Sequence, residues 1–298
     1  MSKIAIIIPF YKIDFFEETI KSVVAQTNKN FVLYIGNDAS PEDPLPIIQQ
    51  YLKPSEYRYY DYPDNLGGKN LALQWERILE NVQEDWFQIL GDDDVLADNF
   101  IEEFYKSVDY CSSHEISCMK VIHHHIDDNN KTIKINDYNI ETIDAKTFFI
   151  SKYLGEVSSS LSENIFQTQK YRKYRFEKIP LAWGSDDIAI LSFSEYGKIY
   201  YNRNTYVKVR ISEVSISGSQ QLNKSKENAY NKFREKIIIK HSKVFSLEFV
   251  NKVIDQYLRY CYSNKQKANY SIANYYLKNF KLVHFAKTLK KVQYINSL

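Results

Sequence analysis

The chain has 298 residues, 44% of them hydrophobic and 15% aromatic, which is the composition of a folded globular protein and excludes a disordered one. This length predicts about two domains. The longest apolar runs, such as residues 4–10, are far shorter than a membrane span. Because no signal peptide is visible and Cys111, Cys118 and Cys261 are odd in number, we expect a cytoplasmic protein with reduced, structural thiols.

The formal net charge of +2 conceals a division along the chain. Residues 222–298 contain 16 Lys and Arg against 4 Asp and Glu, a net charge of +12, which leaves 23 against 33, or −10, for residues 1–221. Long, Lys-rich helical segments also begin near residue 223. We therefore predict an α/β domain of residues 1–220 and a basic helical subdomain of residues 221–298.

The beginning of the chain alternates between strand and helix. Residues 3–10 are almost entirely apolar, as expected of a strand that is buried on both faces of a parallel sheet. Asp14 can cap a helix whose apolar residues recur at helical spacing over residues 16–24, and a second strand over 31–36 runs into a polar turn. This order predicts a mostly parallel sheet in which ligands bind beyond the carboxyl ends of the strands.

The remaining elements follow from the same periodicities. A hairpin over residues 116–135 contains His123, His124 and His125; neighbouring strand residues point to opposite faces, so we do not expect the three to bind one metal. We further predict strands over 57–62, 86–90, 198–201 and 206–211, and helices over 44–52, 99–111, 144–153, 188–193, 224–241, 247–262 and 269–298.

A glycine turn precedes the helix that contains Leu71 and Leu79. It holds Asn65, Gly67 and Lys69. One interpretation is an ordinary loop that leads into a helix. The other is a turn whose backbone N–H groups, together with Lys69, approach a diphosphate.

Two acidic clusters are the strongest candidates for metal-binding or catalytic residues. Asp92, Asp93 and Asp94 follow Gly91 directly after an apolar strand, where three carboxylates repel one another unless a cation balances them. They indicate either a divalent metal site or a solvated acidic turn. Asp186 and Asp187 open a later helix, where they act either as helix-capping charges or as a catalytic base.

Taken together, the motifs resemble glycosyltransferase family 2, the inverting, nucleotide-sugar-dependent enzymes of the Rossmann-like GT-A fold. The resemblance covers roughly residues 1–218. Four elements occur in the family's order: Ile6-Ile7-Ile8-Pro9-Phe10-Tyr11, Asn37-Asp38-Ala39-Ser40, Leu90-Gly91-Asp92-Asp93-Asp94 and Gly184-Ser185-Asp186-Asp187. Each is weak alone, and their order and spacing make the signal.

The resemblance implies roles for these positions. Residues expected to bind the nucleotide are Pro9, Tyr11, Asp38, Asn65, Gly67, Lys69 and Asp92. Asp93, with Asp94 next, would bind Mn²⁺ or Mg²⁺ bridging the diphosphate. Asp186 would be the general base, with Asp187 beside it in the catalytic pair.

Four positions depart from the family's pattern, and the first is Lys12, which stands where Asn is frequent. Gly91 replaces the first Asp of the commoner middle motif, and Ser185 replaces the Glu of its Glu-Asp pair. Ser212 stands where a metal-binding His is frequent, so a third protein ligand would have to come from elsewhere, for example from Glu213.

The function implied by the resemblance is metal-dependent transfer of a sugar, most simply from a UDP-sugar, to a hydroxyl of a glycan or lipid-linked glycan. The main alternative is a non-catalytic sugar-nucleotide or glycan-binding module on the same fold. A composition rich in Lys, Asn, Ile and Tyr favours bacterial surface-polysaccharide synthesis only by association. The basic subdomain indicates either contact with the inner face of the cell membrane or a solvated cover or homodimer contact. Nucleic acid is not an expected partner, because no recognised binding module accompanies the charge.

Overall fold

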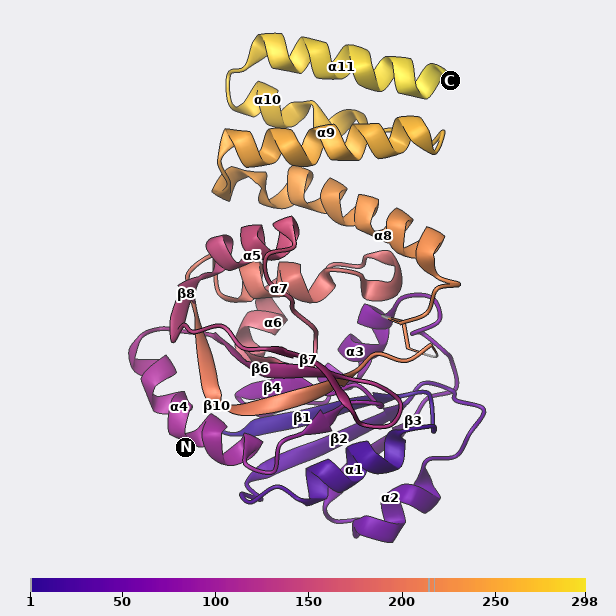
Figure 1. Ribbon diagram of the computed structural model, residues 1–298, viewed down its shortest axis with the longest axis vertical. Helices are drawn as coiled ribbons and strands as arrows, with labels where there is room; N and C mark the ends of the chain where they lie inside the picture. Colours follow the sequence, from indigo (N-terminus) through magenta and orange to yellow (C-terminus); the bar gives the residue numbers. More distant parts are fainter. Residues whose placement is uncertain (1, 214, 217) are drawn as a thin grey trace. The chain divides into compact units, whose positions relative to one another are not determined.

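The computed structural model describes residues 2–213, 215–216 and 218–298. It divides into two compact units, Met1–Leu222 and Asn223–Leu298, coloured from indigo to orange and from orange to yellow in Figure 1. The sequence places the boundary near residue 220. Each unit is described by itself below.

The first unit is built on a ten-stranded mixed sheet with the strand order β3-β2-β1-β4-β9-β6-β10-β5, to which β7 adds beside β6 and β8 beside β10. Strands β3, β2, β1 and β4 run parallel, and β9 is antiparallel to both of its neighbours. The strands are β1 (Ile4–Phe10), β2 (Phe31–Asn37), β3 (Tyr57–Asp61), β4 (Trp86–Ile89), β5 (Val95–Leu96), β6 (Cys118–Ile126), β7 (Thr132–Asn136), β8 (Thr142–Asp144), β9 (Asn164–Gln167) and β10 (Lys198–Arg210).

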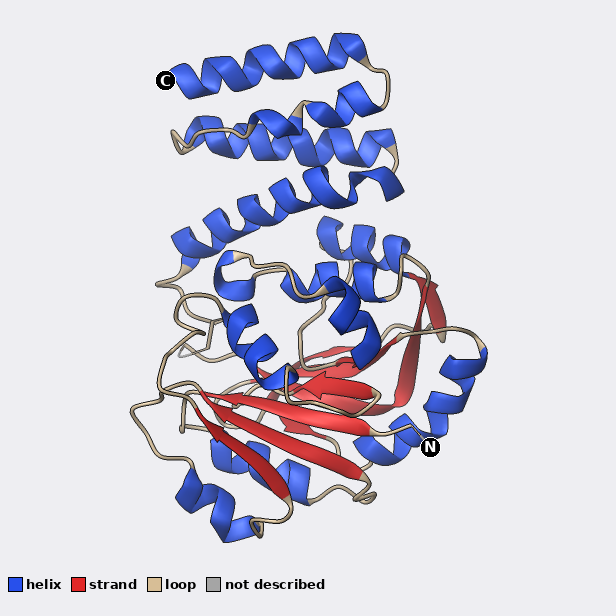
Figure 2. Ribbon diagram, turned by 180° about the vertical axis from the view of Figure 1, so that it is seen from behind, coloured by secondary structure: helices blue, strands red, loops and turns tan. Residues whose placement is uncertain are grey.

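Helices cover both faces of this sheet, as Figure 2 shows. Ile4, Ile6, Ile8 and Phe10 of β1 share one core with α1, α2 and α4, and the opposite face packs on α3, α6 and α7 through rings such as Phe87. Strand residues alternate between the faces, so the uninterrupted apolar run of β1 is explained by burial on both sides. The helices are α1 (Phe16–Val24), α2 (Leu45–Tyr51), α3 (Leu71–Leu79), α4 (Phe100–Ser113), α5 (Ala145–Leu154), α6 (Thr168–Tyr174) and α7 (Ser185–Phe193), with a 3-10 turn at Pro180–Ala182.

Several sequence expectations need correction. Residues 198–210 form one strand instead of two. The pairing of β10 with β6 shifts register between Asn202 and Tyr206, but the chain stays extended through this irregularity. Asp14 does not cap α1, whose N-cap is Phe15 without a side-chain hydrogen bond. Strands β5, β8 and β9 and helix α6 were not predicted; all are short and lack a clear period.

The second unit is helical. It contains α8 (Asn223–Lys236), which continues into a π-helical turn at Ile237–His241 and a 3-10 turn at Ser242–Val244, then α9 (Leu247–Ser263), a 3-10 turn at Tyr270–Ile272, α10 (Asn274–Lys278) and α11 (Leu282–Ser297). The predicted helix over 269–298 is therefore three pieces. The core of this second unit contains the buried side chains of Phe233, Val253, Tyr257 and Val292. Throughout the described chain, every helix is too short or too polar to cross a bilayer.

Candidate active site

The carboxyl ends of the parallel strands meet around one cavity of about 470 Å³. Because β1, β2 and β4 run in the same direction, the residues that follow them share one edge of the sheet. Eight of the sequence-predicted residues line this cavity: Pro9, Tyr11, Asp38, Asn65, Gly67, Asp92, Asp93 and Asp94. The volume suits a small-molecule ligand.

Asp38 organises one wall of the cavity. Its buried carboxylate accepts hydrogen bonds from the backbone N–H groups of Leu66 at 2.9 Å and Gly67 at 2.7 Å and pairs with the guanidinium of Arg77. Arg77 in turn lies 3.7 Å over the ring of Tyr62. A side chain at Gly67 would place its Cβ 2.6 Å from Asp38 Oδ2, so only glycine allows this approach. The glycine turn is thus fixed against Asp38.

The three consecutive carboxylates have different partners. Asp92 Oδ2 accepts hydrogen bonds from the backbone N–H groups of Tyr11 and Lys12, both at 2.8 Å, and so ties the loop after β4 to the loop after β1. Asp94 accepts from the backbone N–H of Arg210 at 2.9 Å and from the Ser162 hydroxyl. The carboxylate of Asp93 accepts no hydrogen bond within the part of the chain that the structure describes. Asp93 is therefore the member left to face a ligand.

Burial makes this cluster unfavourable as three bare anions. It raises the pKa of Asp93 well above its usual range, and the charges of Asp94 and Asp92 raise it further, against a smaller opposing effect of Lys12 and Arg210. Burial also raises the pKa of Asp92, and it raises that of Asp94 to about 6. A cation next to Asp93 would reverse this effect.

The residues fit a divalent cation that is held mainly by a ligand. Nowhere in the described ranges do three or more His, Cys, Asp or Glu side chains gather as a ready metal cage. Carboxylate oxygens are nevertheless the donors that Mg²⁺ prefers, and this ion is usually bound by one or two carboxylates together with substrate phosphates. Asp93 and Asp94 match that pattern. Glu213 is exposed, and Val214 of the same segment lies outside the described residues, as does Ser217.

Arg210 is a residue of the site that sequence reasoning did not select. Its side chain is fully buried, and its Nε donates to the carbonyl of Asp93 at 3.1 Å while Nη2 pairs with Glu18 at 2.6 Å. The guanidinium also lies 3.9 Å over the ring of Phe15. Arg210 therefore fixes the backbone of the acidic loop. Because Lys198, Arg203 and Lys208 also lie on β10, the charge alone does not single out Arg210 in the sequence.

Asp186 and Asp187 occupy the first turn of α7, after a strained approach. Leu181 and Ala182 adopt left-handed backbone angles, with φ of 58° and 50°, and Gly184 follows at 80°. Such conformations cost of order 1 kcal/mol or more outside glycine and concentrate at functional sites. Leu181 lines the cavity, whereas Asp186, Asp187 and the exposed Lys69 are not among the residues that line it.

The two carboxylates of this pair have different environments. Asp187 is buried with Oδ2 3.7 Å from Lys152 Nζ, which neutralises it. Burial, and then the charge of Asp187, raise the pKa of Asp186 to about 7, although Lys152 and Lys120 oppose the shift. A carboxylate with a pKa near neutrality suits a general base. Asp186 is thus the better candidate of the two, and Asp187 has a supporting place.

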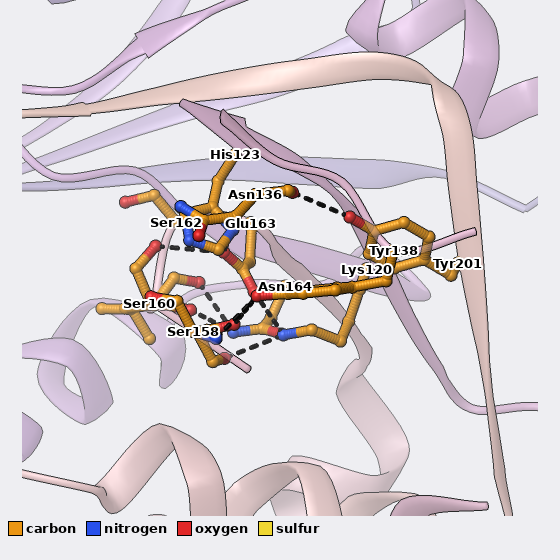
Figure 3. Close-up of polar contacts among 12 residues, drawn as sticks. Lys120, His123, Asn136, Tyr138, Ser158, Ser160, Ser162, Glu163, Asn164 and Tyr201 are labelled. Carbon is orange, nitrogen blue, oxygen red and sulfur yellow. Dashed lines mark hydrogen bonds and ion pairs between the residues drawn. The ribbon is translucent and has the colours of Figure 1, made fainter. Parts of the chain in front are cut away.

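A buried ionic network supports the loop of residues 155–163, part of which lines the cavity (Figure 3). Lys120, His123 and Glu163 are completely buried, with Lys120 Nζ 2.5 Å from Glu163 Oε1 and His123 Nδ1 paired with Glu163 Oε2. Lys120 also donates to Ser159 Oγ at 2.9 Å and to Asn164 Oδ1 at 2.6 Å. Sequence reasoning considered His123 only as a metal ligand, and a charge on an apolar strand was the signal for Lys120.

This network links the two acidic clusters through the loop of residues 155–163. At one end, Ser162 donates to Asp94 and accepts from the backbone N–H of Gly91 at 3.1 Å. At the other, Lys152 donates to the carbonyl of Ser159 at 3.1 Å beside Asp187. Residues 160–162 of this serine-rich loop therefore form a wall of the cavity that is held by hydrogen bonds on both sides.

Comparison with known proteins agrees with this geometry. The model of the family described as "Glycosyl transferase family 2" matches residues 5–184, more than half of the chain. "Glycosyltransferase GlyA" of Streptococcus pneumoniae serotype 4 is 21% identical over 190 residues, which are 61% of this chain and 24% of GlyA. The chain thus spans about a quarter of the length of that curated relative.

Solved structures share the fold. Residues 1–349 of S. aureus TarS in complex with UDP superimpose with a TM-score of 0.58 at 12% identity, and the same protein in complex with UDP-GlcNAc gives 0.59 at 13%. Each match covers 99% of this chain and 90% of the TarS chain. The expected GT-A fold with a helical C-terminal part is confirmed, and with the family model covering residues 5–184 the chain belongs to glycosyl transferase family 2.

Proposed function

We propose that this glycosyltransferase moves a sugar from a UDP-sugar to an acceptor hydroxyl with inversion at the anomeric carbon, in a metal-dependent reaction. The observation that carries the proposal is the Asp93 carboxylate, which accepts no hydrogen bond from the described chain and lines the same cavity as Asp38 and the glycine turn. The choice of UDP is supported by the similarity of fold to TarS, whose structures contain UDP and UDP-GlcNAc.

The donor nucleotide fits the wall that Asp38 organises. Leu71 and Trp75 add apolar surface to the cavity, and the carboxylate of Asp38 supplies a hydrogen-bond acceptor held in place by Arg77. Pro9 and Tyr11 complete the opening at the end of β1. Lys69 is exposed on the glycine turn, and its contact with the diphosphate stays a prediction.

The diphosphate would lie toward the acidic loop. Mg²⁺ or Mn²⁺ at Asp93, with Asp94 as the second carboxylate, would supply neutralising charge for the leaving nucleoside diphosphate. Asp92 and Arg210 hold the backbone of this loop through hydrogen bonds to Tyr11, Lys12 and the Asp93 carbonyl. Asp93 is thus presented on a rigid support.

Asp186 would act on the acceptor. Its carboxylate takes the proton of the acceptor hydroxyl as that oxygen attacks the anomeric carbon and the bond from this carbon to the diphosphate oxygen breaks. Attack from the side opposite the leaving group inverts the anomeric configuration. General-base assistance of this kind contributes roughly 10² to 10⁴ in rate. A glycan or lipid-linked glycan acceptor, and a homodimer, stay predictions.

Calorimetric titration of the purified chain with UDP, GDP and dTDP, with and without Mn²⁺, tests the proposal. We expect UDP to bind, more tightly with Mn²⁺, and Asp93→Ala to lose the contribution of the metal. Asp109→Ala, which removes an exposed carboxylate from α4, is the matched control and should bind normally. If none of the nucleotides binds, the proposal is wrong; binding without transfer to any acceptor would favour the non-catalytic alternative.

A further inference from the structure

The connection between α10 and α11 exposes apolar side chains to an unusual degree. Phe280 is 91% exposed, Leu282 63% and Val283 65%, and Leu277 is 46% exposed. The four lie within seven consecutive residues. Single exposed apolar residues are common on protein surfaces, but a contiguous group marks an interaction site.

The backbone holds this group in a costly conformation. The C=O of Tyr276 accepts a hydrogen bond from the N–H of Lys281 at 2.8 Å, which closes the end of α10 in the pattern that places the intervening residue in the left-handed region. That residue is Phe280, with φ of 56°. Glycine is preferred at such a position because a side chain there is strained. Phe280 is therefore strained and exposed at once, and no burial within its own unit offsets either.

Basic residues are interleaved with these apolar side chains. Lys278 and Lys281 alternate with them in the sequence, and residues 256–298 contain eight Lys and Arg with no Asp or Glu. At the same end of this unit, where Figures 1 and 2 both place the connection from α8 to α9, Lys240 and Lys243 are exposed. An anionic surface would be attracted by the lysines and would accept the apolar side chains between them.

We propose that residues 277–283 are a membrane-contacting tip that binds the surface of a bilayer containing anionic lipids. Phe280, Leu282 and Val283 enter the boundary between headgroups and acyl chains, and Lys278 and Lys281 remain among the anionic headgroups. The mixture of apolar and basic groups on a short turn fits such a surface. This inference does not depend on the donor nucleotide or on the reaction.

Vesicle flotation of the full chain tests the proposal without nucleotide. We expect binding to vesicles of phosphatidylcholine containing phosphatidylglycerol, weaker binding at high salt and little binding to phosphatidylcholine alone. Phe280→Gly should lower the affinity for anionic vesicles roughly tenfold or more, because a buried Phe side chain is lost. The same variant should unfold at a higher temperature, because glycine relieves the strained φ, and this separates binding from folding.

A charge-matched pair of double variants completes the test. Lys278→Gln with Lys281→Gln should lower the affinity roughly tenfold or more. Lys265→Gln with Lys267→Gln removes the same charge from the exposed connection after α9 and should have a clearly smaller effect. The proposal is wrong if the wild type does not bind anionic vesicles or if Phe280→Gly binds them unchanged. It is also wrong if the two double variants lose the same amount of affinity. Self-association that Phe280→Gly abolishes, without vesicle binding, would assign the tip to a second copy of the chain instead.

Discussion

Lys120→Met is the perturbation whose outcome depends most directly on the buried network. Lys120 and Glu163 are both completely inaccessible, and their charged atoms lie 2.5 Å apart. Removing the lysine leaves the Glu163 carboxylate buried, with His123 and the hydroxyl of Ser160 as its remaining side-chain partners among the described residues. Loss of one partner of a buried ion pair typically costs about 3–5 kcal/mol in the free energy of unfolding.

The lowered pKa of Glu163 gives a second measure of how much its ion pairs contribute to the free energy of unfolding. The charges of His123 and Lys120 outweigh burial and lower this pKa from 4.5 to about 2. At about 1.4 kcal/mol per pH unit, the shift corresponds to roughly 3 kcal/mol of stability. For a lowered carboxyl pKa, this stability is complete above pH 4.5 and is lost as the pH falls toward 2, so more than half should be gone at about pH 3.

Urea denaturation of four proteins measures this prediction: wild type, Lys120→Met, Glu163→Gln and the double variant. We expect each single variant to be destabilised and the double variant to be more stable than the sum of the two effects implies, because removing both charges leaves neither one unpaired. Lys21→Met removes an exposed partner of Glu17 and should change little. Additive effects in the double variant, or a wild-type advantage that does not shrink between pH 4.5 and 3, would refute the reasoning.

Three further predictions concern the candidate active site. Asp186→Asn should keep its affinity for UDP, but its transfer rate should fall roughly 10²- to 10⁴-fold. The kcat of the wild type should fall as the pH drops below about 7, where Asp186 becomes protonated. An unchanged transfer rate in Asp186→Asn would exclude this residue as the base. Gly67→Ala should weaken UDP binding roughly tenfold by calorimetry, because the new Cβ meets Asp38. Gly155→Ala, also strained but outside the cavity, should lower stability and spare affinity. Ser162→Ala should cost about 1–3 kcal/mol in urea, because buried Asp94 loses a donor, and normal stability would contradict that contact.

The parallel half of the fold could be predicted from the sequence because its elements carry strong periods. The run over residues 3–10 matches β1, and the strands over 31–36 and 57–62 match β2 and β3 to within one residue. The antiparallel hairpin predicted over residues 116–135 is formed by β6 and β7. Strands β5, β8 and β9 could not be predicted, since they are two to four residues long and take their structure from tertiary pairing. The continuity of β10 was missed for a related reason. The polar residues 202–205 indicate a break between two strands, but pairing with the neighbouring strands keeps the chain extended there.

The candidate site likewise contains some residues that could be predicted from the sequence and others that could not. Asp38, Asp93 and Gly67 follow strands or a glycine turn, so their convergence could be predicted from strand direction alone. Arg77 and Arg210 could not be selected, because their roles depend on distant partners, Asp38 and the Asp93 carbonyl. The division of labour among the carboxylates was equally hidden, since three adjacent aspartates look identical until their hydrogen-bond donors are known.

The two carboxylates at the centre of the proposed reaction share one cause for their raised pKa values but have opposite requirements. Burial and a neighbouring carboxylate act on both Asp93 and Asp186. For Asp186, a pKa of about 7 is an advantage, because at neutral pH such a carboxylate is substantially ionised and still basic enough to take a proton. For Asp93, the same surroundings oppose the ionised form until a cation arrives, and the described chain offers that cation few other ligands. Cation and diphosphate should therefore bind together, each supplying what the other lacks, so that the site is completed only when the donor is present.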